Sequence, residues 1–144
     1  MADIAPETPY EAIAIGDTLP PWSRVTDIMH WNRYAAVNDE FLDFHMEDEA
    51  GRAALNPRGA FGMGNLRFAY LHNALAAVFG EVAAVRELSC QFRSINQKGD
   101  LLTVTGIVTG KWQAGGERLL RIALDVRNQD DLSTCPGDAV IAYG

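Results

Sequence analysis

The spacing of hydrophobic residues changes midway along the chain, from a helical period to a strand period. In the first half, Thr26 can cap a helix over Asp27–Val37, where apolar residues recur every three or four positions. A short helix is expected over Asp48–Leu55, and the longest helical segment runs from Gly62 to Phe79. Apolar residues cover most of the circumference of this segment and Gly80 can end it, which predicts a central, buried helix.

After this helix, apolar and polar residues alternate, as they do in strands that bury one face. Strands are expected over residues 88–93, 102–108, 119–127 and 140–143. Turn residues over 97–100 and 114–116 suit hairpins. The pattern therefore predicts three or four long antiparallel strands in meander order.

These elements make an α+β fold in which an antiparallel sheet wraps a long central helix. Residues 1–20 have no clear period, so they are expected to form a loosely structured lead-in. No repeat or linker divides the chain, and 144 residues is an ordinary length for one domain. We therefore expect a single domain over residues 1–144.

Charge and composition exclude several classes of function. The chain has 19 acidic and 12 basic residues, a net charge of −7, which argues against nucleic acid as a partner. Cys90 and Cys135 have no zinc-site spacing, so neither a metal nor a cofactor is expected. The N-terminus lacks the basic and apolar regions of a signal peptide, and no apolar run approaches the ~18 residues of a spanning helix. We expect a cytoplasmic protein that does not bind a membrane.

One polar segment, residues 38–49, carries candidate chemistry. It places Glu40 five residues before His45, with large apolar side chains between them. An imidazole that titrates near neutrality and a carboxylate that shares a water with it can form a general-base pair. Apolar neighbours would exclude solvent and shift both pKa values. Asp39 is an alternative to Glu40, and the same pattern also fits a solvated loop before a helix.

Glycines open the longest helical segment. Gly59, Gly62 and Gly64 leave backbone N–H groups accessible where the helix begins. Such amides, together with the positive end of the helix dipole, can hold an oxyanion. The alternative is that the glycines only allow the buried helix to pack closely against the sheet.

Together these features resemble the MaoC-like (R)-specific enoyl-thioester hydratases and dehydratases, which have the hot-dog fold. The resemblance covers about residues 15–144. Its best matches are Gly16-Asp17-Thr18-Leu19, Phe41–Asp48, Gly62-Met63 and Gly99-Asp100-Leu101-Leu102-Thr103-Val104. It implies that water adds to C3 of a 2-enoyl thioester, or is removed in reverse, while a backbone amide of the central helix stabilises the enolate.

The resemblance assigns roles to individual residues. His45 matches the family's histidine and Gly62 its oxyanion glycine, with Phe61 and Met63 beside the substrate. Glu40 falls on the usual aspartate, a departure that adds one methylene, and Phe61 stands where a histidine often precedes the glycine. The loop is closer to the Asp-Phe-x-Asp-x-His of the small subunits of steroid side-chain hydratases, which work with a second MaoC-like chain.

The resemblance also implies partners. The substrate would be an acyl thioester of coenzyme A or acyl carrier protein, and the chain would form a homodimer or a heteromer with a second hot-dog chain. Cations that could meet the carrier's phosphates are Arg58, Arg67, Arg93 and Lys98. One alternative is a non-catalytic subunit. A thioesterase is disfavoured, because hot-dog thioesterases usually carry an acidic residue early in the central helix, and residues 62–78 have none.

Overall fold

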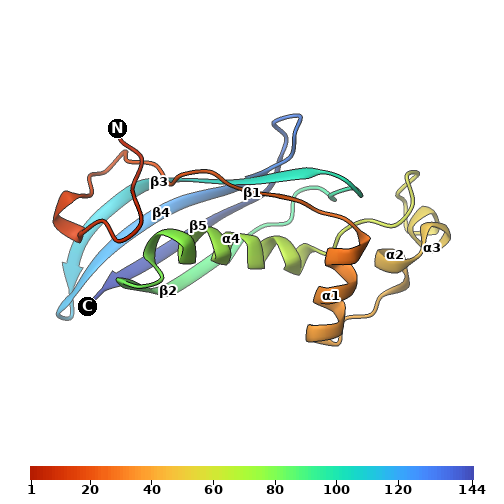
Figure 1. Ribbon diagram of the computed structural model, residues 1–144, viewed down its shortest axis with the longest axis horizontal. Coiled ribbons are helices and arrows are strands. Elements are labelled where there is room, and N and C mark those ends of the chain that lie inside the picture. The colour runs from red at the N-terminus through yellow and green to blue at the C-terminus, as the bar shows by residue number, and fades with distance from the viewer.

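The computed structural model describes residues 1–144 and contains one antiparallel sheet curled around a long helix (Figure 1). The sheet has five strands in the order β1-β3-β4-β5-β2. The strands are β1 (Trp22–Val25), β2 (Ala83–Cys90), β3 (Leu101–Ala114), β4 (Glu117–Arg127) and β5 (Ser133–Tyr143). The predicted α+β hot-dog architecture is confirmed, with five strands in place of three or four.

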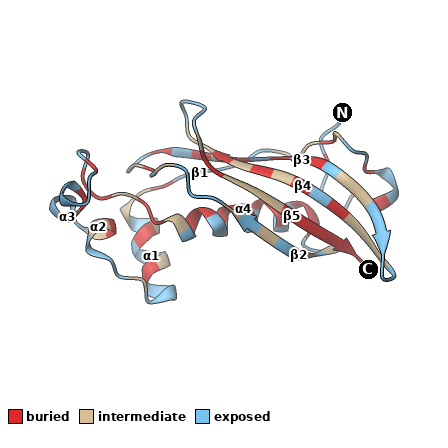
Figure 2. Ribbon diagram, turned by 180° about the vertical axis from the view of Figure 1, so that it is seen from behind, coloured by how far each residue is buried: buried red, intermediate tan, exposed pale blue.

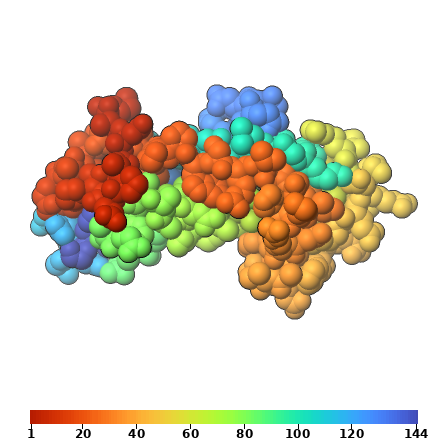
Figure 3. Space-filling model, viewed as in Figure 1, coloured from red at the N-terminus to blue at the C-terminus, as the bar shows by residue number.

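The helices divide between the sheet and one end of the molecule. They are the 3-10 turn η1 (Tyr10–Ala12), α1 (Ile28–Asn38), α2 (Asp43–Met46), α3 (Asp48–Ala53) and α4 (Gly64–Phe79). The sheet curls around α4, whereas α1, α2 and α3 lie beyond one end of the sheet (Figure 1). We call residues 26–63 the helical lobe, which projects as a separate mass in Figure 3. None of the helices is both long and apolar enough to cross a membrane.

The core lies between the concave face of the sheet and α4. Inward residues alternate with outward ones along β3 and β4, visible as bands of buried residues in Figure 2. The largest fully buried side chains of this core include Leu71, Leu75 and Phe79 of α4, Leu102, Val104 and Val108 of β3, and Leu120 and Ile122 of β4. Each such side chain contributes roughly 1.5–3 kcal/mol of transfer free energy.

The path of the chain between β2 and β3 corrects the expected meander. Residues 97–100 do form a turn, with Gly99 at φ 82°. However, β2 pairs with β5, so residues 91–100 carry the chain from one edge of the sheet towards the other. Turn residues indicate that the chain changes direction, but they do not show that the strands before and after the turn pair with each other. The hairpin at 114–116 is confirmed, since β3 pairs with β4 across Gly115 and Gly116.

The first twenty residues are not a loose lead-in, because several of their apolar side chains complete the core. Buried positions in this segment are Ile4, Tyr10, Ile13 and Leu19. The chain then forms β1, which pairs antiparallel with β3. The hydrophobic pattern does not predict this strand, because Pro20-Pro21 is followed by only four strand residues, too few for a period to show.

The start of α1 differs by one residue from the prediction. Asp27 caps the helix and accepts a hydrogen bond from the Met29 amide at 2.9 Å. Thr26 is buried and accepts one from the Trp31 indole at 2.9 Å. The expected apolar stripe is also narrower, because the Val37 side chain is 84% exposed.

Candidate active site

His45 lies in the helical lobe on the four-residue helix α2, and its side chain is buried. Its Nδ1 atom lies 2.7 Å from the backbone oxygen of Phe61. A carbonyl oxygen can only accept a hydrogen bond, so Nδ1 carries the proton and donates it. This contact holds the imidazole in the tautomer whose Nε2 atom has a lone pair available for a proton.

The surroundings of His45 favour its neutral form. Burial lowers the pKa of His45 below its ordinary value of 6.5, although the hydrogen bond to Phe61 and the charge of Glu40 act in the opposite direction. The imidazole is therefore neutral at neutral pH. A neutral imidazole with a fixed orientation and a free ring nitrogen has the properties of a general base.

Of the two candidate carboxylates, Glu40 is the one whose charge acts on His45. Asp39 ends α1 in the left-handed conformation, with φ 54°, and is exposed. Glu40 is half-buried, and its charge acts on His45 and on Tyr34, whose pKa is raised first by burial and then by that charge. Asn65 of α4 donates a hydrogen bond to Glu40 Oε2 at 3.3 Å. The change of direction after α1 therefore brings Glu40, His45 and the beginning of α4 together.

Aromatic rings shield the histidine from solvent. The ring of Phe61 stacks on that of Phe44, with centroids 5.4 Å apart and planes 12° apart. Both rings meet the His45 imidazole edge to face, at centroid distances of 4.5 Å for Phe44 and 5.2 Å for Phe61. Phe61, named as a substrate-binding residue from the sequence, thus orients His45 through its carbonyl oxygen and covers it with its ring.

The beginning of α4 offers backbone amides, though not at the expected glycine. The N–H of Gly62 donates to the backbone oxygen of Asn96 at 2.9 Å. The amides of Met63 and Gly64 have no hydrogen-bond acceptor, and no side chain caps the helix. The Met63 side chain is fully buried in the core, so this residue offers only its backbone. The amides without an acceptor at the beginning of α4 therefore start at Met63, after Gly62.

The glycines here also have a packing role. A Cβ atom at Gly62 would lie 2.0 Å from the side-chain nitrogen of Asn96, and one at Gly64 would lie 2.8 Å from the Phe92 ring. Real Cβ contacts are essentially never closer than 3.0 Å, so a larger residue at either position would force the Asn96 side chain or the Phe92 ring to move. The same segment therefore combines closely packed glycines with free backbone amides.

A polar network supports the backbone that holds His45. The side chain of Asp48, on α3, accepts a hydrogen bond from the Ala60 amide at 3.0 Å and pairs with Lys98. The buried side chain of Asn56 donates to the Gly59 oxygen at 2.6 Å and exchanges two hydrogen bonds with Gln97. The segment that presents the Phe61 carbonyl is thus fixed from two sides.

The cations proposed to meet a carrier's phosphates have different surroundings. Arg67 is buried in α4 and donates to the Thr134 oxygen at 3.0 Å, so it is part of the interior. Lys98 is paired with Asp48, whereas Arg58 and Arg93 are exposed and form no ion pair. No three His, Cys, Asp or Glu side chains are grouped so that they could hold a metal ion.

Sequence reasoning missed two residues of the site, Asn65 and Tyr34. Asn65 contacts Glu40 from the first turn of α4, and Tyr34 lies close enough to feel its charge. A signal existed only for Asn65, which is a polar residue at the start of an otherwise apolar helix. Tyr34 falls on the apolar period of α1, and periodicity cannot distinguish a core ring from one beside a carboxylate.

Comparison with known proteins gives structural neighbours only. No family model and no curated protein matches the sequence. The R-hydratase PhaJ1 from Pseudomonas aeruginosa superposes with a TM-score of 0.82 at 23% identity, covering 94% of this chain and 84% of that one. The (R)-hydratase from A. caviae involved in PHA biosynthesis gives 0.77 at 18% identity, covering 93% and 99%.

A third neighbour is a complex of two chains. The ChsH1-ChsH2 complex from Mycobacterium tuberculosis matches with a TM-score of 0.79 at 16% identity, over 91% of this chain and 98% of that one. At these identities the likeness concerns the fold. The chain therefore has the hot-dog fold that (R)-hydratases and a MaoC-like dehydratase from Rhodospirillum rubrum also have.

Proposed function

We propose that the chain is an enoyl-thioester hydratase and 3-hydroxyacyl-thioester dehydratase of the MaoC-like type. The observation that carries the proposal is the pairing of Glu40 with a buried His45 whose Nδ1–H is fixed by the Phe61 carbonyl. This leaves a neutral imidazole with a free ring nitrogen, on which the charge of the Glu40 carboxylate acts. Such a pair is suited to activating one water.

In the proposed reaction, Glu40 accepts a hydrogen bond from a water molecule and orients it towards C3 of the 2-enoyl thioester. His45 Nε2 takes a proton from this water as its oxygen bonds to C3. The protonated imidazole then supplies the proton that C2 gains. In the reverse direction, His45 takes the proton from C2 and returns it to the hydroxyl that leaves C3 as water, while Glu40 again holds that water.

The charge that develops on the thioester oxygen needs donors. The amides of Met63 and Gly64, at the positive end of the α4 dipole, have no other acceptor and would supply these hydrogen bonds. Removing one donor of such an oxyanion hole typically costs about 10²–10³ in rate. Because these donors belong to the backbone, side-chain substitutions test the catalytic pair more directly.

The test is kinetic. His45→Ala should lower the rate of hydration by about 10²–10⁴, the usual contribution of a general acid or base, with an unchanged circular dichroism spectrum. Glu40→Gln should abolish hydration and Glu40→Asp should retain part of the rate. Asp39→Asn is the matched control and should be mild, because its side chain is exposed.

Two results would contradict the proposal. If Asp39→Asn is inactive and Glu40→Gln is active, the carboxylate is assigned to the wrong neighbour. If none of the variants matters on any active substrate, the residues do not carry the reaction. A panel of short, long and steroid-derived enoyl thioesters, on coenzyme A and on acyl carrier protein, would define the substrate.

We further propose that the chain associates with a second hot-dog chain, either a copy of itself or a different one. Strand β2 lies at one edge of the sheet, and its free backbone groups can pair with another strand. The chain also resembles one member of a solved complex of two chains. A strictly monomeric species in sedimentation at micromolar concentration would count against a homodimer.

The second candidate function is that of a non-catalytic subunit, which the likeness to one member of a two-chain complex favours. It predicts no hydration by the purified chain alone, and activity when a second hot-dog chain encoded nearby is added. In that case His45→Ala in this chain should leave the activity of the complex unchanged, which separates the two candidates.

A further inference from the structure

A groove runs along α4 and begins next to Asn65, the residue that contacts Glu40. It has a volume of about 370 Å³ and lies between α1, α4 and β1. Leu66 lines one end, directly after the Asn65 that contacts Glu40, and Asn73 lines the other. Seven residues of helix separate Leu66 from Asn73, so the groove extends for about 10 Å along the helix axis.

The groove combines apolar walls with positive charge. Its apolar and aromatic lining includes Tyr34, Leu66 and Tyr70, whereas Arg24 of β1 and Arg33 of α1 bring guanidinium groups to the same cavity. Neither arginine forms an ion pair, although the chain has 19 acidic residues. Two unpaired cations on a groove in a chain with net charge −7 indicate a site for an anion.

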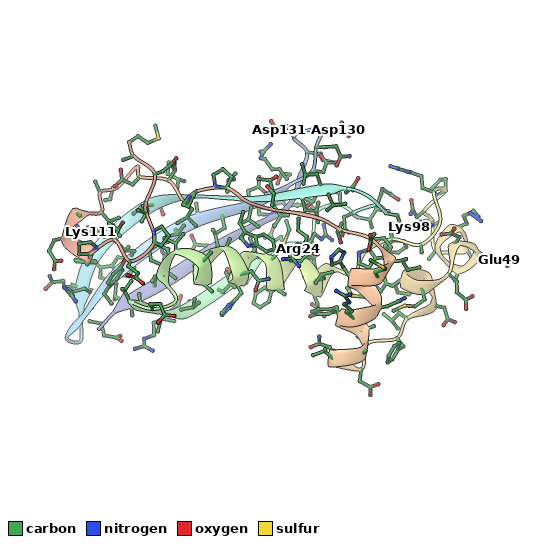
Figure 4. All side chains as sticks on the ribbon, in the orientation of Figure 1. Arg24, Glu49, Lys98, Lys111, Asp130 and Asp131 are labelled. Carbon is green, nitrogen blue, oxygen red and sulfur yellow. The ribbon has the colours of Figure 1, made fainter.

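Arg24 is held in place by aromatic packing. Its guanidinium carbon lies 5.2 Å from the centroid of the Trp22 ring, and that ring packs against Tyr70 at 5.2 Å. Figure 4 labels Arg24 alongside α4, near the lobe. A guanidinium stacked on an aromatic ring keeps its donors free for a carboxylate. Arg24 is thus oriented before any ligand arrives.

The acidic groups around the groove lie at its margins. Asp27 is the hydrogen-bond partner of His30, at 3.1 Å from Nδ1, and Glu40 lies beside Asn65 at the catalytic end. No carboxylate reaches Arg24 or Arg33. The positive region is therefore separate from the site where water would be activated.

We propose that this groove binds the acyl chain of a thioester whose far end carries an anionic group, held by Arg24 and Arg33. This inference rests on the proposed function and names the substrate class. Tyr70, which feels the charge of Arg24, is five residues beyond Asn65, about 8 Å along the helix. The anionic group would thus lie several carbons beyond the double bond. The phosphates of a carrier would not reach these arginines from the thioester end, because the pantetheine arm is longer than the groove.

The experiment compares two matched ligands, a straight-chain 2-enoyl thioester and the same thioester with a terminal carboxylate. The kcat/KM of the wild-type chain should be about tenfold higher for the carboxylated substrate. A hydrogen bond between charged groups contributes a free energy that corresponds to about this factor. Arg24→Gln and Arg33→Gln should each reduce this preference about threefold or more, and the double variant should remove it. Arg24→Lys should retain part of it. Arg121→Gln, on the outer face of β4, is the matched control and should keep the full preference.

Binding of the saturated thioesters, which cannot be hydrated, separates this inference from the proposed function. If neither enoyl thioester is hydrated but the saturated carboxylated thioester binds with an arginine-dependent preference, the groove assignment stands without the activity. If both are hydrated with no preference, or with one that Arg24→Gln and Arg33→Gln leave intact, the inference is wrong. It is also wrong if Arg24→Gln and Arg33→Gln lower kcat/KM equally for both coenzyme A thioesters and do not affect pantetheine thioesters, because the arginines then bind the carrier's phosphates.

Discussion

The body of the molecule, made of the sheet and α4, and the helical lobe are stabilised by different interactions. In the body, long strands of up to 14 residues form continuous backbone ladders, and their inward residues are almost all apolar. In the lobe, α2 and α3 have four and six residues, too few to be stable alone. Buried polar side chains such as His45 and Asn56 connect these short helices to the backbone.

The difference separates stability from positioning. Apolar burial is non-directional and depends on area, so the body tolerates changes that conserve volume. Hydrogen bonds depend on geometry, so the lobe can set the orientation of a reactive group. That orientation is lost when one hydrogen bond is removed. We therefore expect substitutions in the body to lower the free energy of unfolding, and substitutions in the lobe to affect activity more than global stability.

The largest stability effect is expected in the body. Leu120→Ala would remove a fully buried side chain from the centre of β4 and should lower the free energy of unfolding by about 2–5 kcal/mol. Urea denaturation followed by circular dichroism measures the change. The control is Leu119→Ala, on the opposite face of the same strand, where the side chain is only half-buried. Equal losses at both positions would show that the inner face is not the core.

A smaller effect with a different character is expected in the lobe. Asn56→Ala would leave the Gly59 oxygen and the Gln97 side chain without their partner, at a cost of about 1–3 kcal/mol. The loss should appear as faster hydrogen exchange in residues 43–63 and as lower activity, with little change in the exchange of β4. Asn32→Ala, an exposed site on α1, is the control. Uniformly faster exchange would mean that the lobe and body unfold as one unit.

The start of the lobe, where the chain leaves β1, should show an effect of about 1 kcal/mol. Trp31→Phe keeps most of the ring but removes the hydrogen bond from the indole nitrogen to Thr26, which is 2.9 Å long and buried. A double-mutant cycle with Thr26→Val isolates this contact from the change in ring size. Trp112→Phe, at an exposed position on β3, serves as the control. A coupling energy near zero would contradict a role for this bond in holding α1.

The smallest effect is on the pH dependence. Burial lowers the pKa of His45 in the folded chain below 6.5, so the unfolded chain binds this proton more readily. Stability should therefore fall as the pH drops below about 6.5 towards the folded pKa, and His45→Gln should remove this part of the dependence. The pKa values of Asp17, Asp27 and Asp48 are also lowered, from 3.8, so their contributions are lost only at more acidic pH.

Activity offers a second measurement of the same group. If His45 acts as the base, the acidic limb of the rate profile should lie below pH 6.5, because the imidazole stays neutral to lower pH than in water. A limb above pH 6.5 would contradict a neutral, buried base.

The accuracy of the sequence predictions also differs between the two regions. The helix over Gly62–Phe79 and the strand over residues 119–127 were placed within two residues, because each has a long and regular apolar period. β1 was missed and the partner of β2 was wrong, since strand pairing depends on contacts between distant residues. The site residues Asn65 and Tyr34 were missed for the same reason.

The sequence by itself determined the fold class, a long buried helix packed on an antiparallel sheet. It also identified Glu40 and His45 as a candidate pair. Local periodicity and spacing contain that information, because burial of one face requires a regular pattern. Only the tertiary structure showed that the charge of Glu40 acts on His45, which ring nitrogen of His45 carries the proton, and that the Gly62 amide is already bonded. Those features depend on Phe61, Asn65 and Asn96, residues that reach the site only when the lobe folds onto the end of the sheet.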